Sequence, residues 1–456
     1  MTHDELVGLY LKEVARRGMG AGELLAAARS TTDLKTTTFF DRCLSRPGLL
    51  GHAEQTQLAA DLANLHAALT ALPDRMFGGD VAAFARAVGM TEVQVTAILR
   101  TQGAAPTKMA RGDLYLDDTG FKVMELNMGS SVGGGDNVIL NRAFLAHPMI
   151  AEFVAAHGLT YTDTLAETAS TIFAETGGSP GDGRLIAVVD WPGTIDTWKA
   201  VLRRSAQEFA RYGIEMVPCH LGELTVRDRR VWLGRRPVDV IYRVFLIGDL
   251  LDPNGPELMD PVLRAAERGE VQIFTPMDSQ LYASKGALAL LSDEANWHMY
   301  RPAELASLDR LLPWTRILRP GPVTVAGEQV DLLEYARAKR PELVIKPTAM
   351  YGGIGVVPGW LTDADEWDRQ LAAAMDGSFV LQRRVRPVPE LFPADDGPMP
   401  FVLTWGAYLL AGGYGGMWLR GTPDLDTGGV NMNTGASATC CFHEAEPAPA
   451  DRPASG

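Results

Sequence analysis

Two short polar motifs between residues 111 and 127 contain residue types that could hold a metal ion beside a polyphosphate. In each motif the polar residues stand two positions apart and so share one face of a strand, as in Arg111/Asp113 and Glu125/Asn127. Two carboxylates and an amide oxygen form an oxygen-only ligand set, which suits Mg²⁺ held against phosphate groups. Arg111 could clamp a transferred phosphoryl group. The alternative is ordinary polar residues at strand edges, because motifs this short recur by chance.

A second segment joins an apolar strand that ends in a lysine to a glycine-rich turn. Residues 343–347 have the sequence LVIKP and residues 350–356 have the sequence MYGGIGV. A lysine at a strand end and the backbone N–H groups of a glycine turn can surround phosphates. The segment has neither the Walker A order nor the dinucleotide-binding glycine spacing. A lysine that caps a strand before a plain hairpin turn is the alternative.

Two further segments could complete a nucleotide site. Residues 379–385 form an apolar strand that ends in polar residues, and its backbone could contact the edge of an adenine, although most such strands only fill a core. Residues 412–420 place four glycines before Arg420. Glycines let the backbone approach a ligand closely, and an arginine offers a planar fork for phosphate or carboxylate. A bulged hairpin with a surface arginine is the alternative.

The apolar patterns around these motifs predict the elements that position them. Helical spacing from residue 4 to about residue 100 predicts a helical N-terminal lobe. Residues 114–126, with a turn at 117–120, predict a β-hairpin that runs into the Gly/Ser stretch 129–135. Alternating strands and helices in 185–276 predict a small, mainly parallel α/β unit, and the pattern after residue 285 is α+β. The predicted fold class is therefore multi-lobed, α+β and α/β.

Composition restricts the classes of function. The chain has 456 residues, with 42 Lys plus Arg against 56 Asp plus Glu and a net charge of −14. With 46% hydrophobic and 21% charged residues, it can form sizeable cores and is not a disordered chain. The negative charge argues against nucleic-acid and anionic-membrane partners. The four cysteines form no CxxC pair, and no apolar run is long enough to span a bilayer, so we expect a cytoplasmic protein.

The four segments, in this order, resemble an ATP-grasp carboxylate–amine ligase of the rearranged glutathionylspermidine synthase-like group. In the usual ATP-grasp order the lysine strand and the hinge precede the Glu-x-Asn motif. Here Glu125 and Asn127 come about two hundred residues before Lys346, which matches the circularly permuted group. The resemblance covers roughly residues 105 to 440 and extends to Asp249 and Ser284.

The resemblance implies an ATP-grasp fold of circularly permuted order. The implied segments are a helical N-terminal lobe at 1–104, the metal-binding hairpin with an acid-substrate loop at 105–180, and a small pre-ATP-grasp α/β subdomain at 181–283. The nucleotide-binding lobes follow at 284–445, and a disordered tail at 446–456.

The resemblance also assigns roles residue by residue. The implied Mg²⁺ ligands are Asp113, Glu125 and Asn127. The residues implied to contact ATP, with the last one marking the adenine hinge, are Lys285, Lys346, Tyr351, Gly352, Gly353, Gly355 and Gln382. The residues implied to stabilise the phosphoryl group and the tetrahedral centre are Arg111 and Arg420. The residues implied to meet the acid substrate are Ser130, Ser131, Tyr242 and Arg243.

The implied reaction joins a small amino or peptidic acid to an amine, such as an amino acid, through an acyl phosphate, with release of ADP and phosphate. Both reactants of the first step are anionic, so Mg²⁺ and cationic side chains must offset their repulsion. The alternatives are an ATP-grasp phosphotransferase and a non-catalytic nucleotide-binding protein. The partners expected are the small acid and amine, and a homodimer is left open.

Two departures from the family pattern limit what is carried over. Cys43 lies in the helical lobe without a convincing base, so no amidase and no product hydrolysis are predicted. The residues that flank Gly129–Ser131 differ from those of a glutathione site, so the identity of the substrate does not transfer.

Overall fold

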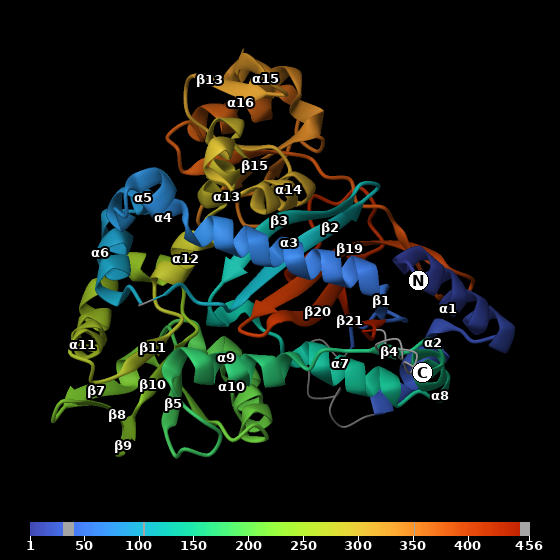
Figure 1. The fold of residues 1–456 in the computed structure, drawn as a ribbon, viewed down its shortest axis with the longest axis horizontal. Coiled ribbons are helices and arrows are strands. Elements are labelled where there is room, and N and C mark those ends of the chain that lie inside the picture. Colours follow the sequence, from blue (N-terminus) through green and yellow to red (C-terminus); the bar gives the residue numbers. More distant parts are fainter. Residues whose placement is uncertain (31–40, 104, 351, 447–456) are drawn as a thin grey trace, which may run out of the picture.

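The computed structural model of the chain describes residues 1–30, 41–103, 105–350 and 352–446. Tyr351 and all of the expected tail beyond residue 446 therefore lie outside the described residues. The described chain forms a mixed α/β fold with several sheets. Figure 1 shows a central sheet crossed by helix α3 (His52–Thr70), a group of helices and strands above it and a parallel sheet below it.

The central sheet is eight-stranded and mostly antiparallel, with the path β1-β21-β20-β19-β2-β3, while β18 pairs with β19 and β4 with β21. The predicted hairpin is present as β2 and β3 and extends beyond residues 114–126 at both ends. The strands are β1 (Gly48–Leu50), β2 (Ala110–Asp117), β3 (Gly120–Met128), β4 (Leu159–Thr160), β18 (Glu390–Phe392), β19 (Met399–Leu410), β20 (Gly413–Thr422) and β21 (Ser437–Glu444).

Helices cover both faces of the central sheet. Trp405 of β19 packs in the same core cluster as Leu62 of α3. Tyr408 of β19 instead packs in the cluster that contains Leu165 of α9 (Thr164–Thr176). Because successive side chains of a strand point to opposite faces, a strand that is covered twice becomes apolar almost throughout. This explains why the second half of β19 is buried at every position.

The segment 185–276 contains a four-stranded sheet, β11-β10-β5-β6, in which every pairing is parallel, as its alternating pattern predicts. Residues 241–246 form a largely apolar run that predicts a strand of that length, but strand β10 ends at Arg243. The reason is that Asp249 accepts a hydrogen bond of 2.6 Å from the Leu246 backbone and caps a short 3₁₀ turn. The elements are β5 (Leu185–Asp190), α10 (Ile195–Ala210), β6 (Glu215–His220), β10 (Val240–Arg243), α11 (Gly255–Glu267) and β11 (Gln272–Phe274). The sequence analysis did not predict the antiparallel sheet of β7 (Leu224–Arg227), β8 (Arg230–Leu233) and β9 (Arg236–Val238).

A second four-stranded sheet, with the antiparallel order β12-β17-β15-β16, lies among the C-terminal helices. It carries the predicted lysine strand β15 beside the predicted hinge strand β17. Its strands and the neighbouring hairpin are β12 (Thr315–Ile317), β13 (Pro322–Val325), β14 (Glu328–Asp331), β15 (Leu343–Pro347), β16 (Val357–Pro358) and β17 (Phe379–Arg383). The helices around it are α12 (Asp278–Tyr282), α13 (Lys285–Ser292), α14 (Pro302–Leu311), α15 (Leu332–Ala338) and α16 (Ala364–Ala373).

The N-terminal segment forms helices where the periodicity predicts them, and it also contributes β1 to the central sheet, beside β21. Asp61 of α3 accepts hydrogen bonds from Ser307 (2.7 Å) and Arg310 (2.6 Å) of α14, and so ties the N-terminal helices to the C-terminal part of the fold. The remaining helices are α1 (His3–Arg17), α2 (Ala21–Ser30), α4 (Leu72–Phe77), α5 (Val81–Ala87), α6 (Glu92–Thr101), α7 (Gly135–Leu145) and α8 (Pro148–Ala156).

Among the described residues, no single helix has the length and apolar character needed to cross a bilayer. One bent helix pair, Ser130–Leu145 with Pro148–Ala156, meets that criterion only when its two parts are joined.

Candidate functional site

A cavity of about 380 Å³ lies where the central sheet meets the sheet of β15 and β17. Both polar motifs of the sequence reach it, since Asp113 and Glu125 of the hairpin and Lys346 of β15 line the same space. The Lys346 ammonium lies 3.4 Å from the carbonyl oxygen of Met124 on β3. Segments that are far apart in sequence therefore converge on one cavity.

Asp113 lies between two arginines on the floor of the cavity. Arg111 Nε and Arg420 Nη2 each lie 2.8 Å from Asp113 Oδ1. Burial would raise the pKa of Asp113, but Arg111 and Arg420 outweigh it and hold that pKa well below its usual range. The Nε of Arg420 has no hydrogen-bond partner among the described residues, although this side chain is only 8% exposed. A buried guanidinium N–H without an acceptor is available to an anionic ligand.

Lys285 connects the hairpin to the glycine-rich turn. It is the first residue of α13, which begins after the N-cap Ser284, whose side chain accepts a hydrogen bond from the backbone of Gly286. The Lys285 ammonium lies 3.1 Å from Glu125 Oε2 and also donates to the Met350 carbonyl at 2.9 Å. The start of α13 therefore reaches the cavity.

Lys346 is buried and has a neutral partner. Its ammonium donates a hydrogen bond of 2.7 Å to Gln382 Oε1. Burial, and secondarily the positive charge of Lys285, lower the pKa of Lys346 to about 8. Gln382 is itself buried and does not belong to the cavity wall, whereas Arg384 and the residues that follow it do. Its role as the marker of an adenine hinge stays a prediction.

The charges around the cavity do not balance. Four cationic side chains surround the two carboxylates of Asp113 and Glu125, namely Arg111, Lys285, Lys346 and Arg420. Uncompensated charge is costly in a site that is largely removed from water. A polyanionic ligand would supply the missing negative charge, so the arrangement is suited to a polyphosphate.

The hairpin fits a magnesium ion that arrives with phosphate. Asp113 and Glu125 are direct cross-strand partners and both line the cavity, while Asn127 pairs with Arg111 and lies 3.4 Å from Asp113. Across the described ranges, no group of three or more His, Cys, Asp or Glu side chains could hold a metal. Mg²⁺ usually takes one or two carboxylates and completes its shell with phosphate and water. The residues present fit this mode and not a cage made of protein ligands alone.

The glycine-rich turn forms part of the cavity wall. Gly352 and Gly353 line it, whereas Gly355, which has a φ of +72°, does not. A side chain at Gly355 would also collide with Pro347, because its Cβ would lie 2.8 Å from Pro347 Cγ. This position therefore requires glycine both for its positive φ and for the lack of space for a side chain.

The four residues expected to meet the acid substrate lie outside the cavity wall. Arg243, only 1% exposed, donates to the carbonyls of Thr275 (2.7 Å) and Phe245 (2.5 Å). The hydroxyl of Ser130 contacts the carbonyl of Arg243, the hydroxyl of Tyr242 donates to Ser130 O at 3.2 Å, and Ser131 is exposed. These contacts join the Gly/Ser loop to the parallel sheet. A role in substrate binding stays a prediction for all four.

The structure adds residues that the sequence analysis missed. Trp360 lines the cavity beside Arg384, whose guanidinium carbon lies 4.1 Å from the centre of the Trp360 ring. Tyr115 and Thr404 line it as well. Trp360 follows the glycine turn in sequence but belongs to none of the motifs described above, so only the folded chain identifies it.

Comparison with known proteins gives a likeness in fold. No family model matches the chain, and no curated protein matches its sequence. Among solved structures, the chain is similar to the glutathione synthetase-like effector GSS30 from Globodera pallida in its apo form, at 12% identity and a TM-score of 0.57, over 97% of this chain and 99% of that one. The fold is thus a mixed α/β multi-sheet fold that resembles the fold of this glutathione synthetase-like effector.

Two further structures match less closely. A protein named as a candidate gamma-glutamylcysteine synthetase from Methylobacillus flagellatus KT matches at 14% identity and a TM-score of 0.43, over 78% of this chain and 86% of that one. The D-cycloserine synthetase DcsG matches at 21% identity and a TM-score of 0.28, over 50% of this chain and 70% of that one.

Proposed function

We propose that the chain is an ATP-grasp carboxylate–amine ligase that forms an amide bond and releases ADP and phosphate. The observation that carries the proposal is the convergence of Lys285, Lys346 and Arg420 on the carboxylates of Asp113 and Glu125 in one cavity, with Arg111 paired to Asp113. The likeness in fold to GSS30 supports the ATP-grasp architecture. The glutathionylspermidine synthase-like subgroup, with its circularly permuted order, is part of the proposal. The shared cavity of the early hairpin and the late lysine strand supports it.

In the proposed first step, a carboxylate oxygen of the acid attacks the γ-phosphorus of ATP, the bond to the β-γ bridging oxygen breaks, and ADP leaves. Lys285 and Lys346 would bind the phosphates, and the unpartnered Nε of Arg420 is free to orient the acid or the transferred group. Asp113 and Glu125 would hold Mg²⁺, with Asn127 as the predicted third ligand. Bound there, Mg²⁺ would neutralise charge on the β- and γ-phosphates.

In the second step, the amine nitrogen attacks the acyl carbon. The bond between that carbon and the phosphate oxygen breaks, phosphate leaves, and the nitrogen loses a proton to solvent or phosphate. Arg111 and Arg420 would stabilise the oxyanion that develops. Water must be excluded, because it would hydrolyse the acyl phosphate. The glycine turn at Gly352–Gly353 is the part of the wall we assign to this task.

Within this proposal the substrates are a small amino or peptidic acid and an amine such as an amino acid, and the enzyme works in the cytoplasm. The test is to incubate the purified chain with MgATP and amino acids in pairs, and to measure ADP and product mass. ADP is expected only when acid and amine are both present. Steady AMP formation would point to adenylation and contradict the proposal, and a stable phosphorylated product would identify a phosphotransferase instead.

A further inference from the structure

Three buried polar side chains form a row across three adjacent strands beneath the cavity. Gln382 of β17 pairs directly with Val344 of β15 on one side and with Thr315 of β12 on the other. Lys346 stands two positions beyond Val344 and so shares its face. Lys346, Gln382 and Thr315 are 8%, 3% and 1% exposed. The row therefore leads from the cavity wall into the interior of the sheet.

The hydrogen bonds along this row fix the orientation of the Gln382 amide. The Thr315 hydroxyl donates its one proton to the Pro313 carbonyl at 2.8 Å. It can then only accept from its other neighbour, and Gln382 Nε2 lies 3.1 Å away. The amide oxygen of Gln382 must consequently face Lys346, from which it accepts the hydrogen bond of 2.7 Å. We infer that Thr315 and Gln382 are positioning residues for the Lys346 ammonium, an inference that rests on the proposed phosphate site.

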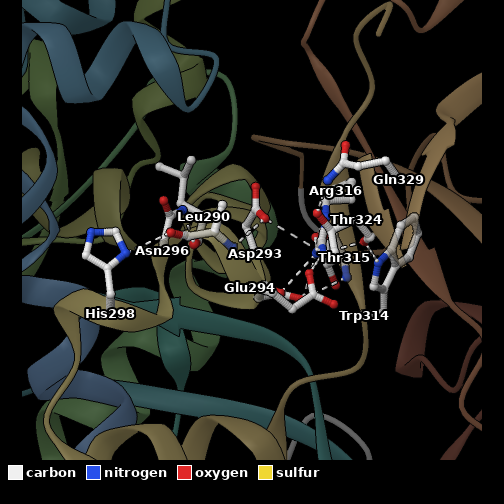
Figure 2. Close-up of polar contacts among 12 residues, drawn as sticks. Leu290, Asp293, Glu294, Asn296, His298, Trp314, Thr315, Arg316, Thr324 and Gln329 are labelled. Atoms are coloured by element: carbon white, nitrogen blue, oxygen red, sulfur yellow. Dashed lines mark hydrogen bonds and ion pairs between the residues drawn. The ribbon is translucent and has the colours of Figure 1, made fainter. Parts of the chain in front are cut away.

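The neighbouring arginine holds strand β12 in place. Figure 2 shows Arg316 between the acidic residues Asp293 and Glu294 on one side and Thr324 of the hairpin on the other. Its guanidinium also donates to the Ser292 carbonyl at 3.0 Å and to the Thr324 carbonyl at 2.9 Å (Figure 2 shows the latter). The Thr315 backbone is anchored too, because its N–H donates to the Ser292 hydroxyl at 2.9 Å. Thr315 is therefore a rigid end point for the row.

The neutrality of Gln382 suits an anion site. An amide oxygen orients the ammonium and leaves its full positive charge available to a phosphate. Lys285 has the opposite arrangement, since the carboxylate of Glu125 already compensates it at 3.1 Å. A glutamate at position 382 would bind Lys346 more strongly and cancel the charge that the ligand needs. Gln382→Glu should therefore weaken the binding of anions although it strengthens the contact.

The experiment measures the binding of ATP and of inorganic tripolyphosphate by titration calorimetry. Thr315→Val keeps the shape of the side chain and removes the hydroxyl, and Thr315→Ser restores the hydroxyl. The matched control is Thr324→Val, because the Thr324 hydroxyl also accepts a hydrogen bond from a glutamine, Gln329 at 2.6 Å (Figure 2), but on the hairpin and away from Lys346. Circular dichroism and thermal melting of each variant verify that it is folded.

We expect Thr315→Val and Gln382→Glu to weaken both ligands by about tenfold, the effect of about one hydrogen bond, while Thr315→Ser and Thr324→Val stay within about twofold of the wild type. Wild-type affinity in folded Thr315→Val overturns the inference, as does an equal loss in Thr324→Val. If the wild type binds tripolyphosphate but not ATP, and Thr315→Val weakens the binding of tripolyphosphate, the positioning role of Thr315 is supported and the proposed function is contradicted. A wild type that binds neither ligand overturns both.

Discussion

Arg420 Nη2 lies 2.8 Å from Asp113 Oδ1, so a carboxylate predicted to bind magnesium is already paired with a cation. Arg111 pairs with the same carboxylate, and Lys285 pairs with Glu125. A metal ion that arrives alone must compete with these cations, whereas a triphosphate gives the cations new partners and frees the carboxylates for the metal.

The first prediction is that Mg²⁺ and nucleotide bind together. Millimolar Mg²⁺ alone should leave the melting temperature unchanged, and MgATP should raise it by several degrees, because a ligand that binds only the native state stabilises it. Differential scanning fluorimetry with Mg²⁺ alone, with ATP and EDTA, and with MgATP measures this. A shift with Mg²⁺ alone as large as that with MgATP would contradict the prediction.

The second prediction concerns turnover. Lys346→Ala and Glu125→Ala should each lower kcat by at least about a hundredfold, since removal of one group that stabilises developing charge typically costs that much or more. Lys339→Ala is the matched control, because Lys339 is exposed in the same lobe and, among the described residues, its ammonium pairs only with Glu342, at 3.5 Å. Full activity in either folded site variant would show that the site is assigned wrongly.

The hairpin could be predicted from the sequence, because its evidence is local. The turn at 117–120 sets the register from Asp117 opposite Gly120 to Leu114 opposite Val123, and a β-bulge between Leu114 and Asp113, which the sequence does not reveal, then shifts the register by one residue and places Asp113 opposite Glu125. The parallel sheet is likewise encoded in a strand–helix alternation that spans neighbouring segments.

The partners of the buried polar residues could not be predicted in this way. Thr315 and Gln382 are 67 positions apart and meet because a three-residue strand, too short to show a period, pairs with β17. Arg243 has the charge and position of a substrate residue at a strand end, but its guanidinium donates to the carbonyl groups of Thr275 and Phe245. Residue type gives the capacity to bind, and tertiary contacts decide what is bound.

The third prediction is a stability effect that depends on pH. Both ring nitrogens of buried His3 face acceptors, the Leu49 carbonyl at 2.6 Å and Glu390 at 3.3 Å. Burial lowers the pKa of His3, but the charge and hydrogen bond of Glu390 outweigh it, and the net shift is upward from 6.5. Because the folded-state pKa is raised, the stabilisation is complete below pH 6.5 and is lost as the pH rises through the folded-state value.

His3→Gln should therefore lower the free energy of unfolding more at pH 6 than at pH 9. At pH 6 the loss should be about 1.5–3 kcal/mol, the range of hydrogen bonds to charged groups. Chemical denaturation of wild type and variant at both pH values gives the difference. His298→Gln serves as the control, because His298 is exposed and, within the part of the chain that the structure describes, its ring bonds only to the Ala295 carbonyl, at 2.9 Å. A cost for His3→Gln that is the same at pH 6 and pH 9 would show that the imidazole is not charged in the folded state.

The fourth prediction separates the base end of the nucleotide from its phosphates. Trp360 stacks on Arg384 at 4.1 Å, and both line the cavity, whereas Gln382 and Thr315 do not. If this stack contacts the adenine, Trp360→Leu should weaken ATP by about threefold to tenfold, the usual contribution of aromatic and cation–π contacts, and leave tripolyphosphate binding unchanged. Trp360→Phe should recover most of the loss, because it keeps an aromatic face for the guanidinium. Trp198→Leu, at a tryptophan 42% exposed on α10, controls for the general effect of removing an indole. An equal loss of tripolyphosphate affinity in Trp360→Leu would place this residue with the phosphates instead, next to the glycine turn.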